Sequence, residues 1–211
     1  EKNTYSGTSI EISANNITIN GVSPYTYTGD PIKPTVSVKI NGKVLELGRD
    51  YTVSYADNIN VGTGKIYITG QGDYTSEKNL VVPFTINPLS IKDNGDISIT
   101  VPSCAYNGQP QKPSVTVKFK GRLLKNGTDY TVSYSNNINA GGGTVLITGK
   151  EGGNFSGTKT GTFTIASVPM QNTVRTVSDW TYDVKEKSAQ PKVTVHYQGA
   201  VLKEKSDYTV T

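Results

Sequence analysis

The sequence is poor in the residues on which most enzymes and metal proteins depend. Its 211 residues include one Cys, one His, one Met and one Trp. A single Cys and a single His exclude a framework of several disulfides and most metal-ligand clusters. Ala and Leu contribute only 15 residues, whereas Thr, Val, Ile and Tyr contribute 77. Because β-branched and aromatic residues favour strands and helix formers are scarce, this composition excludes a helical bundle and predicts an all-β fold.

Long apolar runs and runs of one charge sign are also missing. No apolar run approaches the roughly 20 residues of a membrane-spanning helix, so no membrane insertion is expected. The net charge is +4, but Lys and Arg are dispersed, whereas nucleic-acid-binding proteins concentrate them on one face or tail. We therefore expect no nucleic-acid partner, and loose attraction to an anionic wall polymer stays open as an alternative. The chain opens on Glu1 without a secretory signal, which suggests a piece of a longer protein.

The main feature that the sequence does contain is an internal repeat. Residues 27–70 align with residues 106–149 at a constant offset of 79, and 25 of these 44 positions are identical. A third, more divergent copy begins near Val174 and matches only the first half of the others. Residues 10–12 occupy, in this interpretation, the place of residues 163–165, which close the second copy. A period of this size fits a small independent domain.

We therefore expect four segments. They are the tail of a preceding copy at 1–13, a first copy at 14–87, a second copy at 96–166 and the first half of a third copy at 172–211. The linkers at 87–95 and 166–172 each contain one Pro and too little Gly and Ser for a free coil. This predicts an extended rod that bends little at its joints. Strand edges left bare by the half copy could pair with the tail of a neighbouring molecule.

Within a copy, hydrophobic residues recur with a period of two. Val36, Val38 and Ile40 alternate with polar residues, which is typical of a half-buried strand. The dipeptide Asn41-Gly42 follows at once and predicts a type I′ hairpin turn. Residues 57–64 are expected to form a longer loop before the next strand. Short strands separated by Gly, Asn and Pro turns favour a two-sheet sandwich of about seven strands.

The repeated residues resemble bacterial immunoglobulin-like tandem repeats. The resemblance rests on four stretches, which are Tyr106 to Val117, Gly127 to Gly141, Ile147 to Gly149 and Phe155 to Thr158. Such repeats occur in large secreted or wall-anchored proteins, especially of Gram-positive gut bacteria. The resemblance implies tandem immunoglobulin-like β-sandwich domains and an extracellular setting on the bacterial cell surface. It implies no particular ligand, because these repeats serve as spacers, as adhesin stalks and as companions of enzymes or carbohydrate-binding modules.

The thirteen tyrosines could be read as sugar-stacking surfaces, but their positions favour packing. Tyr27, Tyr106 and Tyr182 share one slot of the repeat, and Tyr51, Tyr130 and Tyr208 share another. Tyr67 aligns with Leu146, and Tyr197 aligns with Ile40 and Phe119. Rings that are exchangeable with aliphatic residues are expected to pack in the core or on a sheet face. The hydroxyls of Tyr51 and Tyr130 are expected to bond to backbone, as in a tyrosine corner.

Trp, Cys and His each occur once, and each is a candidate for a binding or catalytic site. Trp180 shares the slot of Tyr25 and Cys104, which favours a buried wedge over a ligand-stacking platform. Cys104 is expected to be a small buried thiol, since nothing near it in sequence would activate it. His196 aligns with Lys39 and Lys118 and is expected on the wet face of a strand.

The sequence gives little support for a calcium site or for an isopeptide crosslink. Residues 57–60 and 136–139 superficially resemble calcium loops, but the second lacks an acid. Turn formation and side-chain bonds to backbone suit these asparagines better. A Lys–Asn isopeptide crosslink would require a buried Lys, Asn and acid, which sequence cannot place. The repeated Asp50, Asp129 and Asp207 are expected to cap the turn before a strand.

These observations predict no catalytic, cofactor-binding or metal site, and no enzyme. The first hypothesis is a structural spacer in a bacterial cell-surface protein of the adhesin-stalk type. The alternative is a binding module for a host ligand, namely a glycan, a mucin or an immunoglobulin. The expected partners are accordingly the neighbouring domains of the same polypeptide and, under the alternative, a host glycan or protein.

Overall fold

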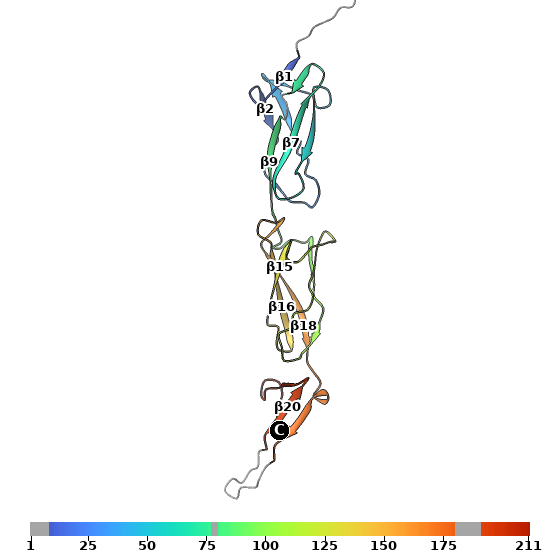
Figure 1. Cartoon of the computed structure of the whole chain (residues 1–211), viewed down its shortest axis with the longest axis vertical. Helices are drawn as coiled ribbons and strands as arrows, with labels where there is room; N and C mark the ends of the chain where they lie inside the picture. Colours follow the sequence, from blue (N-terminus) through green and yellow to red (C-terminus); the bar gives the residue numbers. More distant parts are fainter. Residues whose placement is uncertain (1–8, 77–79, 180–190) are drawn as a thin grey trace, which may run out of the picture. The chain divides into compact units, whose positions relative to one another are not determined.

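The computed structural model describes residues 9–76, 80–179 and 191–211. In these ranges the regular elements are strands, apart from one 3-10 helix at Met170–Asn172 (Figure 1). The all-β expectation is therefore confirmed. The chain divides into two compact units. Unit 1 comprises residues 1–94, 126–131 and 148–158, and unit 2 comprises residues 95–125, 132–147 and 159–211.

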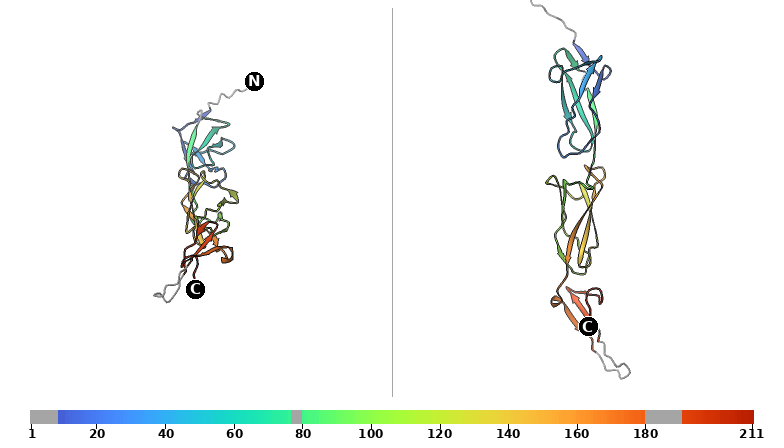
Figure 2. Two further views of the ribbon diagram at one scale, coloured as in Figure 1. Left: turned by 60° about the horizontal axis from the view of Figure 1, so that its bottom comes forward. Right: turned by 180° about the vertical axis from the view of Figure 1, so that it is seen from behind.

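Residues 9–94 form ten short strands, and those before residue 88 lie alongside one another in Figure 1 and in the rear view of Figure 2. They are β1 (Ile10–Ile12), β2 (Ile17–Asn20), β3 (Tyr25–Thr26), β4 (Ser37–Ile40), β5 (Lys43–Val44), β6 (Tyr51–Ala56), β7 (Gly62–Gly70), β8 (Tyr74–Ser76), β9 (Val81–Asn87) and β10 (Leu89–Ser90). One sheet has the order β2-β4-β5 and another the order β3-β9-β7-β6. Strands β3 and β9 run parallel, with Tyr25 opposite Ile86.

Both of these sheets contribute side chains to one hydrophobic core. Val38 of β4 and Ile66 of β7 are fully buried, as is Ile12 of β1. Successive strand residues point to opposite faces, so the period-two pattern places every second side chain inside. Tyr51, Tyr74 and Phe84 supply the buried rings of this core. The core thus consists mainly of β-branched and aromatic side chains, as the composition predicts, together with Leu45 and Leu80.

The expected hairpin turn is present in all three copies. Asn41 and Gly42 have φ angles of 49° and 83°, and β4 pairs with β5 across them. Lys120-Gly121 and Gln198-Gly199 repeat the same pair of positive φ angles. Two positive φ angles in succession define the type I′ turn, and Gly at the second position makes it accessible.

The second copy repeats this topology. Its strands are β11 (Ile97–Thr100), β12 (Cys104–Ala105), β13 (Thr116–Phe119), β14 (Arg122–Leu123), β15 (Tyr130–Ser135), β16 (Gly141–Gly149), β17 (Phe155–Ser156) and β18 (Thr158–Ala166). They form sheets of order β11-β13-β14 and β12-β18-β16-β15. The third copy contributes β19 (Val174–Val177), β20 (Val193–Tyr197) and β21 (Ala200–Val201), in that sheet order.

The structure differs from the sequence expectation in three places, two of them at segment boundaries and one at the start of a strand. Residues 10–12, assigned to a preceding copy, form β1, which pairs with β8 and buries Ile12 in the first core. Residues 89–90, assigned to a linker, form β10, which pairs with β17. Residues 89–90 stand 79 positions after residues 10–11, so both belong to the same place in the repeat. The sequence pattern did not identify this place, because a three-residue apolar pattern suits several strand positions equally well. Strand β7 begins at Gly62, inside the expected loop at 57–64.

Candidate functional site

The repeated tyrosines bond to the backbone of their own copy. The Tyr51 hydroxyl donates to the carbonyl oxygen of Val36 at 3.0 Å, and the Tyr208 hydroxyl repeats this bond on Val193 at 2.9 Å. Tyr130, in the same slot, is 3% exposed. This confirms the packing role of the slot, and it confirms the backbone bond for Tyr51.

The repeated asparagines and aspartates also bond to backbone. The side-chain amides of Asn58 and Asn137 each donate at 2.8 Å, to the carbonyls of Ile32 and Gln111 respectively. The Asp50 carboxylate accepts the Glu46 N–H at 2.8 Å, and Asp207 accepts the Lys203 N–H at 2.7 Å. The expected side-chain bonds to backbone are confirmed at Asn58 and Asn137, and the expected cap is confirmed at Asp50 and Asp207. Over the described residues, no group of three or more His, Cys, Asp and Glu could hold a metal ion.

The unique residues fall in ordinary surroundings. Cys104 is half-buried rather than fully buried, and its Sγ lies 3.9 Å from the Thr164 carbonyl oxygen. His196 is half-buried on β20, between Val174 of β19 and Val201 of β21. Trp180 and Tyr182 lie outside the described residues. Each Lys that the structure describes is exposed or half-buried, so none provides the buried amine that an isopeptide crosslink requires.

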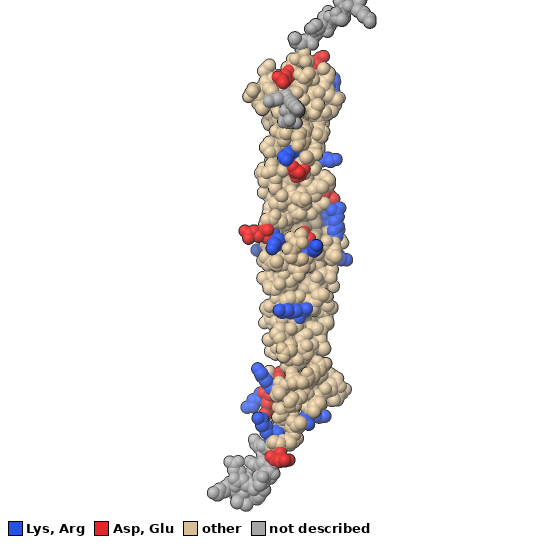
Figure 3. Space-filling model, viewed as in Figure 1, with Lys and Arg blue, Asp and Glu red and all other residues tan. Residues whose placement is uncertain are grey.

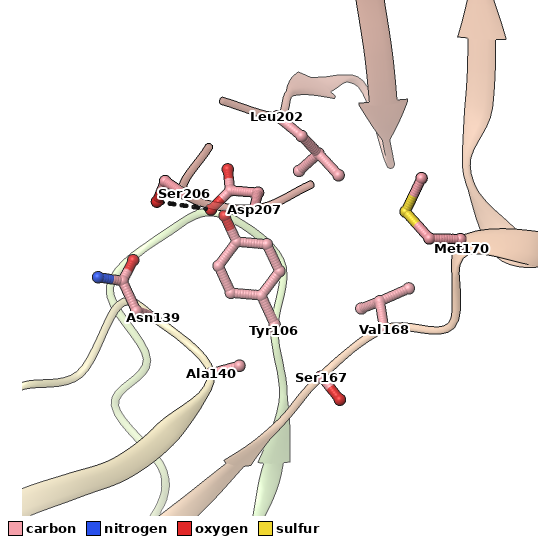
Figure 4. A pocket seen from close by; sticks show the side chains of 9 residues that line it. All are labelled: Tyr106, Asn139, Ala140, Ser167, Val168, Met170, Leu202, Ser206 and Asp207. Carbon is pink, nitrogen blue, oxygen red and sulfur yellow. Dashed lines mark hydrogen bonds between the residues drawn. The ribbon is translucent and has the colours of Figure 1, made fainter. Parts of the chain in front are cut away.

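One hollow lies in unit 2, where loops of the second and third copies meet (Figure 4). It is a cavity of about 210 Å³. The lining residues are Tyr106, Asn139, Ala140, Ser167, Val168, Met170, Leu202, Ser206 and Asp207. In Figure 4, Tyr106 and Asn139 face Ser206 and Asp207, while Leu202, Met170 and Val168 form an apolar side. A second cavity of about 390 Å³ opens on the same Tyr106 and Asn139.

The polar side of this cavity centres on Tyr106 and Asp207. Burial raises the pKa of the Tyr106 hydroxyl, and the charge of Asp207 and a hydrogen bond to its carboxylate raise that pKa further. The hydroxyl therefore stays protonated and serves as a donor at neutral pH. Asp207 also accepts the Lys203 N–H and the Ser206 hydroxyl, which satisfies much of its acceptor capacity. This arrangement connects Tyr106 to the loop of the third copy that carries Asp207, at the wall of the cavity.

In unit 1, the residues that correspond to Tyr106, Asn139 and Ala140 are covered by another segment of the chain. Tyr27, Asn60 and Val61 stand 79 residues before Tyr106, Asn139 and Ala140. Asn154 lies against them: its Oδ1 accepts the Val61 N–H at 2.9 Å, and its Nδ2 donates to Asn60 Oδ1 at 3.0 Å. The ring of Phe155 meets the ring of Tyr27 edge-on, with 5.4 Å between centroids. The same three positions therefore carry a protein contact in unit 1 and line a cavity in unit 2.

Sequence reasoning missed this cluster. It assigned the loop asparagines to turns and to side-chain bonds with backbone. Asn58 and Asn137 make such bonds, whereas the side chain of Asn60 bonds to Asn154. The sequence did contain one indication, because the two copies have Asn at the same position, Asn60 and Asn139. This position lies two residues after Asn58 and Asn137. Nothing in the sequence shows that a segment 93 residues away supplies the partner of Val61.

The surface outside the cavity is mixed in charge. Figure 3 shows Lys and Arg scattered among Asp, Glu and uncharged residues on the face in view. On that face the Lys and Arg residues that the structure describes form no concentrated stripe of the kind that marks a nucleic-acid interface. No helix within the described residues is long and apolar enough to cross a membrane. In the comparisons with known proteins, no family model and no curated protein matches the chain.

Proposed function

We propose that the chain is a non-catalytic structural segment of a bacterial cell-surface protein. In this proposal, immunoglobulin-like β-sandwich copies follow one another as an extended, adhesin-type stalk that holds other domains away from the cell wall. The supporting observation is the use of the repeated polar side chains. Tyr55 and Tyr134 both bond to backbone of their own copy, as do Asn58 and Asn137. Repeated side chains that form hydrogen bonds with backbone stabilise the fold of each copy.

The strand order supports a mechanical role. In the first copy β3 runs parallel to β9, and in the second β12 runs parallel to β18. Tension applied before β3 and after β9 pulls these parallel strands in opposite directions along their length. The hydrogen bonds between them, including Tyr27 N–H to the Asn87 carbonyl at 2.9 Å, then carry the load together rather than one after another. A segment loaded in this way suits a stalk.

Two measurements test the proposal. A glycan array and a pull-down from host secretions should find no specific ligand, because the hydroxyls of Tyr55 and Tyr134 and the amides of Asn58 and Asn137 are already bonded within the fold. Single-molecule pulling on the two ends should give discrete unfolding steps, one for each folded copy. Specific binding at micromolar affinity or tighter, abolished by changing one loop, would favour the host-ligand binding module instead. Smooth extension without steps would also contradict the stalk.

A further inference from the structure

The contact in unit 1 defines what the surface of Tyr27, Asn60 and Val61 recognises. A backbone N–H, a side-chain oxygen and a ring edge meet an Asn side chain and the aromatic ring that follows it. The Asn amide is used at both ends, since it accepts from Val61 and donates to Asn60. An Ala in place of Asn154 could make neither bond. The aromatic neighbour adds an edge-to-face ring contact.

Unit 2 offers the same recognition elements beside a cavity. Tyr106 is half-buried, and Asn139 and Ala140 are exposed. Ala140 conserves the backbone N–H of Val61 and carries a smaller side chain, which leaves more room at this point. All three residues line the cavity of about 210 Å³, and Tyr106 and Asn139 also line the one of about 390 Å³. The smaller one has an apolar side formed by Leu202, Met170 and Val168 (Figure 4).

We propose that Tyr106, Asn139 and Ala140 form a docking site for a peptide segment in which Asn is followed directly by an aromatic residue. The partner of this chemistry is the Gly-rich turn segment of another repeat of this type, as residues 149–157 exemplify. The Asn side chain accepts from the Ala140 N–H and donates to Asn139 Oδ1, and the aromatic ring packs against Tyr106. This inference goes beyond the proposed stalk, because it names an interaction surface and the side chains that occupy it.

The test uses the full chain, labelled with ¹⁵N, and a synthetic peptide with the sequence of residues 150–159. Titration to millimolar peptide should produce saturable shifts of the Ala140 and Gly141 amides. The Val61 amide should not shift, because Asn154 already occupies that surface. A peptide with Ala in place of Asn154 should bind about tenfold more weakly, since two hydrogen bonds are lost.

Variants of the chain provide matched controls. Asn139→Ala should weaken peptide binding severalfold, whereas Asn60→Ala, the same change in the first copy, should leave it unchanged. Absence of saturable shifts at Ala140, or equal affinity of the Asn and Ala peptides, would overturn the docking site. Saturation of this cavity by a glycan that excludes the peptide would overturn it as well. A glycan bound elsewhere would contradict the stalk proposal and leave the docking site standing.

Discussion

The hydroxyl of Tyr55 lies 2.8 Å from the carbonyl oxygen of Pro34 and donates a hydrogen bond to it. The second copy repeats this bond between Tyr134 and Pro113 at 2.7 Å. Burial raises the pKa of both hydroxyls, so both remain protonated donors far into the alkaline range. The bond ties the strand that carries the tyrosine to the Pro-rich segment that precedes β4 or β13.

Tyr55→Phe and Tyr134→Phe should each destabilise the copy that contains them. Each change leaves a proline carbonyl without its partner, at a cost of about 1–3 kcal/mol in the free energy of unfolding. Urea unfolding followed by tyrosine fluorescence measures this loss. Tyr67→Phe is the control, because Tyr67 occupies the slot of Leu146 and should change stability by less than about 0.5 kcal/mol. Equal effects of all three changes would contradict the specific role of the Pro34 and Pro113 bonds.

Gly143→Ala should destabilise the second copy through steric overlap. A Cβ at Gly143 would lie 2.3 Å from the ring of Phe163, so the ring would have to move. Overpacking of this kind costs about 1–3 kcal/mol. The neighbouring Gly142 has no atom within 4 Å of an added Cβ, and Gly142→Ala should be close to neutral. Adding Phe163→Leu should recover part of the loss in Gly143→Ala, and strict additivity in the double mutant would argue against the overlap.

The sequence predicted well those features that depend on neighbouring residues. The Asn41-Gly42 turn and the alternation around Val38 follow from local backbone preferences and from the period of a strand. Features that depend on remote partners were not predictable. The pairing of β1 with β8, and the use of Asn60 to hold Asn154, require knowledge of which segments meet in space. The cavity beside Tyr106 belongs to the same class, because it is formed by loops far apart in the sequence.

Acid should destabilise the first copy through Asp50. Hydrogen bonds from Arg49 and from the Glu46 N–H hold the pKa of the Asp50 carboxyl below its ordinary value of 3.8. A lowered folded-state pKa means that the stabilisation is fully present above the unfolded value and is lost as pH falls through the folded value. Unfolding midpoints in urea from pH 7 to pH 2 should show this loss. Asp50→Asn should weaken the copy at neutral pH and flatten its acid response, whereas Asp73→Asn, at an exposed site, should not.

Asn154→Ala should release the loop that contains Val61. The Asn154 amide accepts the Val61 N–H and donates to Asn60, so its removal leaves the Val61 N–H without that acceptor. Loss of one bond of about 0.5–1.5 kcal/mol should accelerate hydrogen exchange at the Val61 amide by roughly 2- to 10-fold. Asn60→Ala is the matched control, because it removes the second bond and keeps the one to Val61. Since Asn154 Oδ1 remains in place in that variant, the Val61 amide should keep most of its protection, and equal acceleration in both variants would show that the loop moves for another reason.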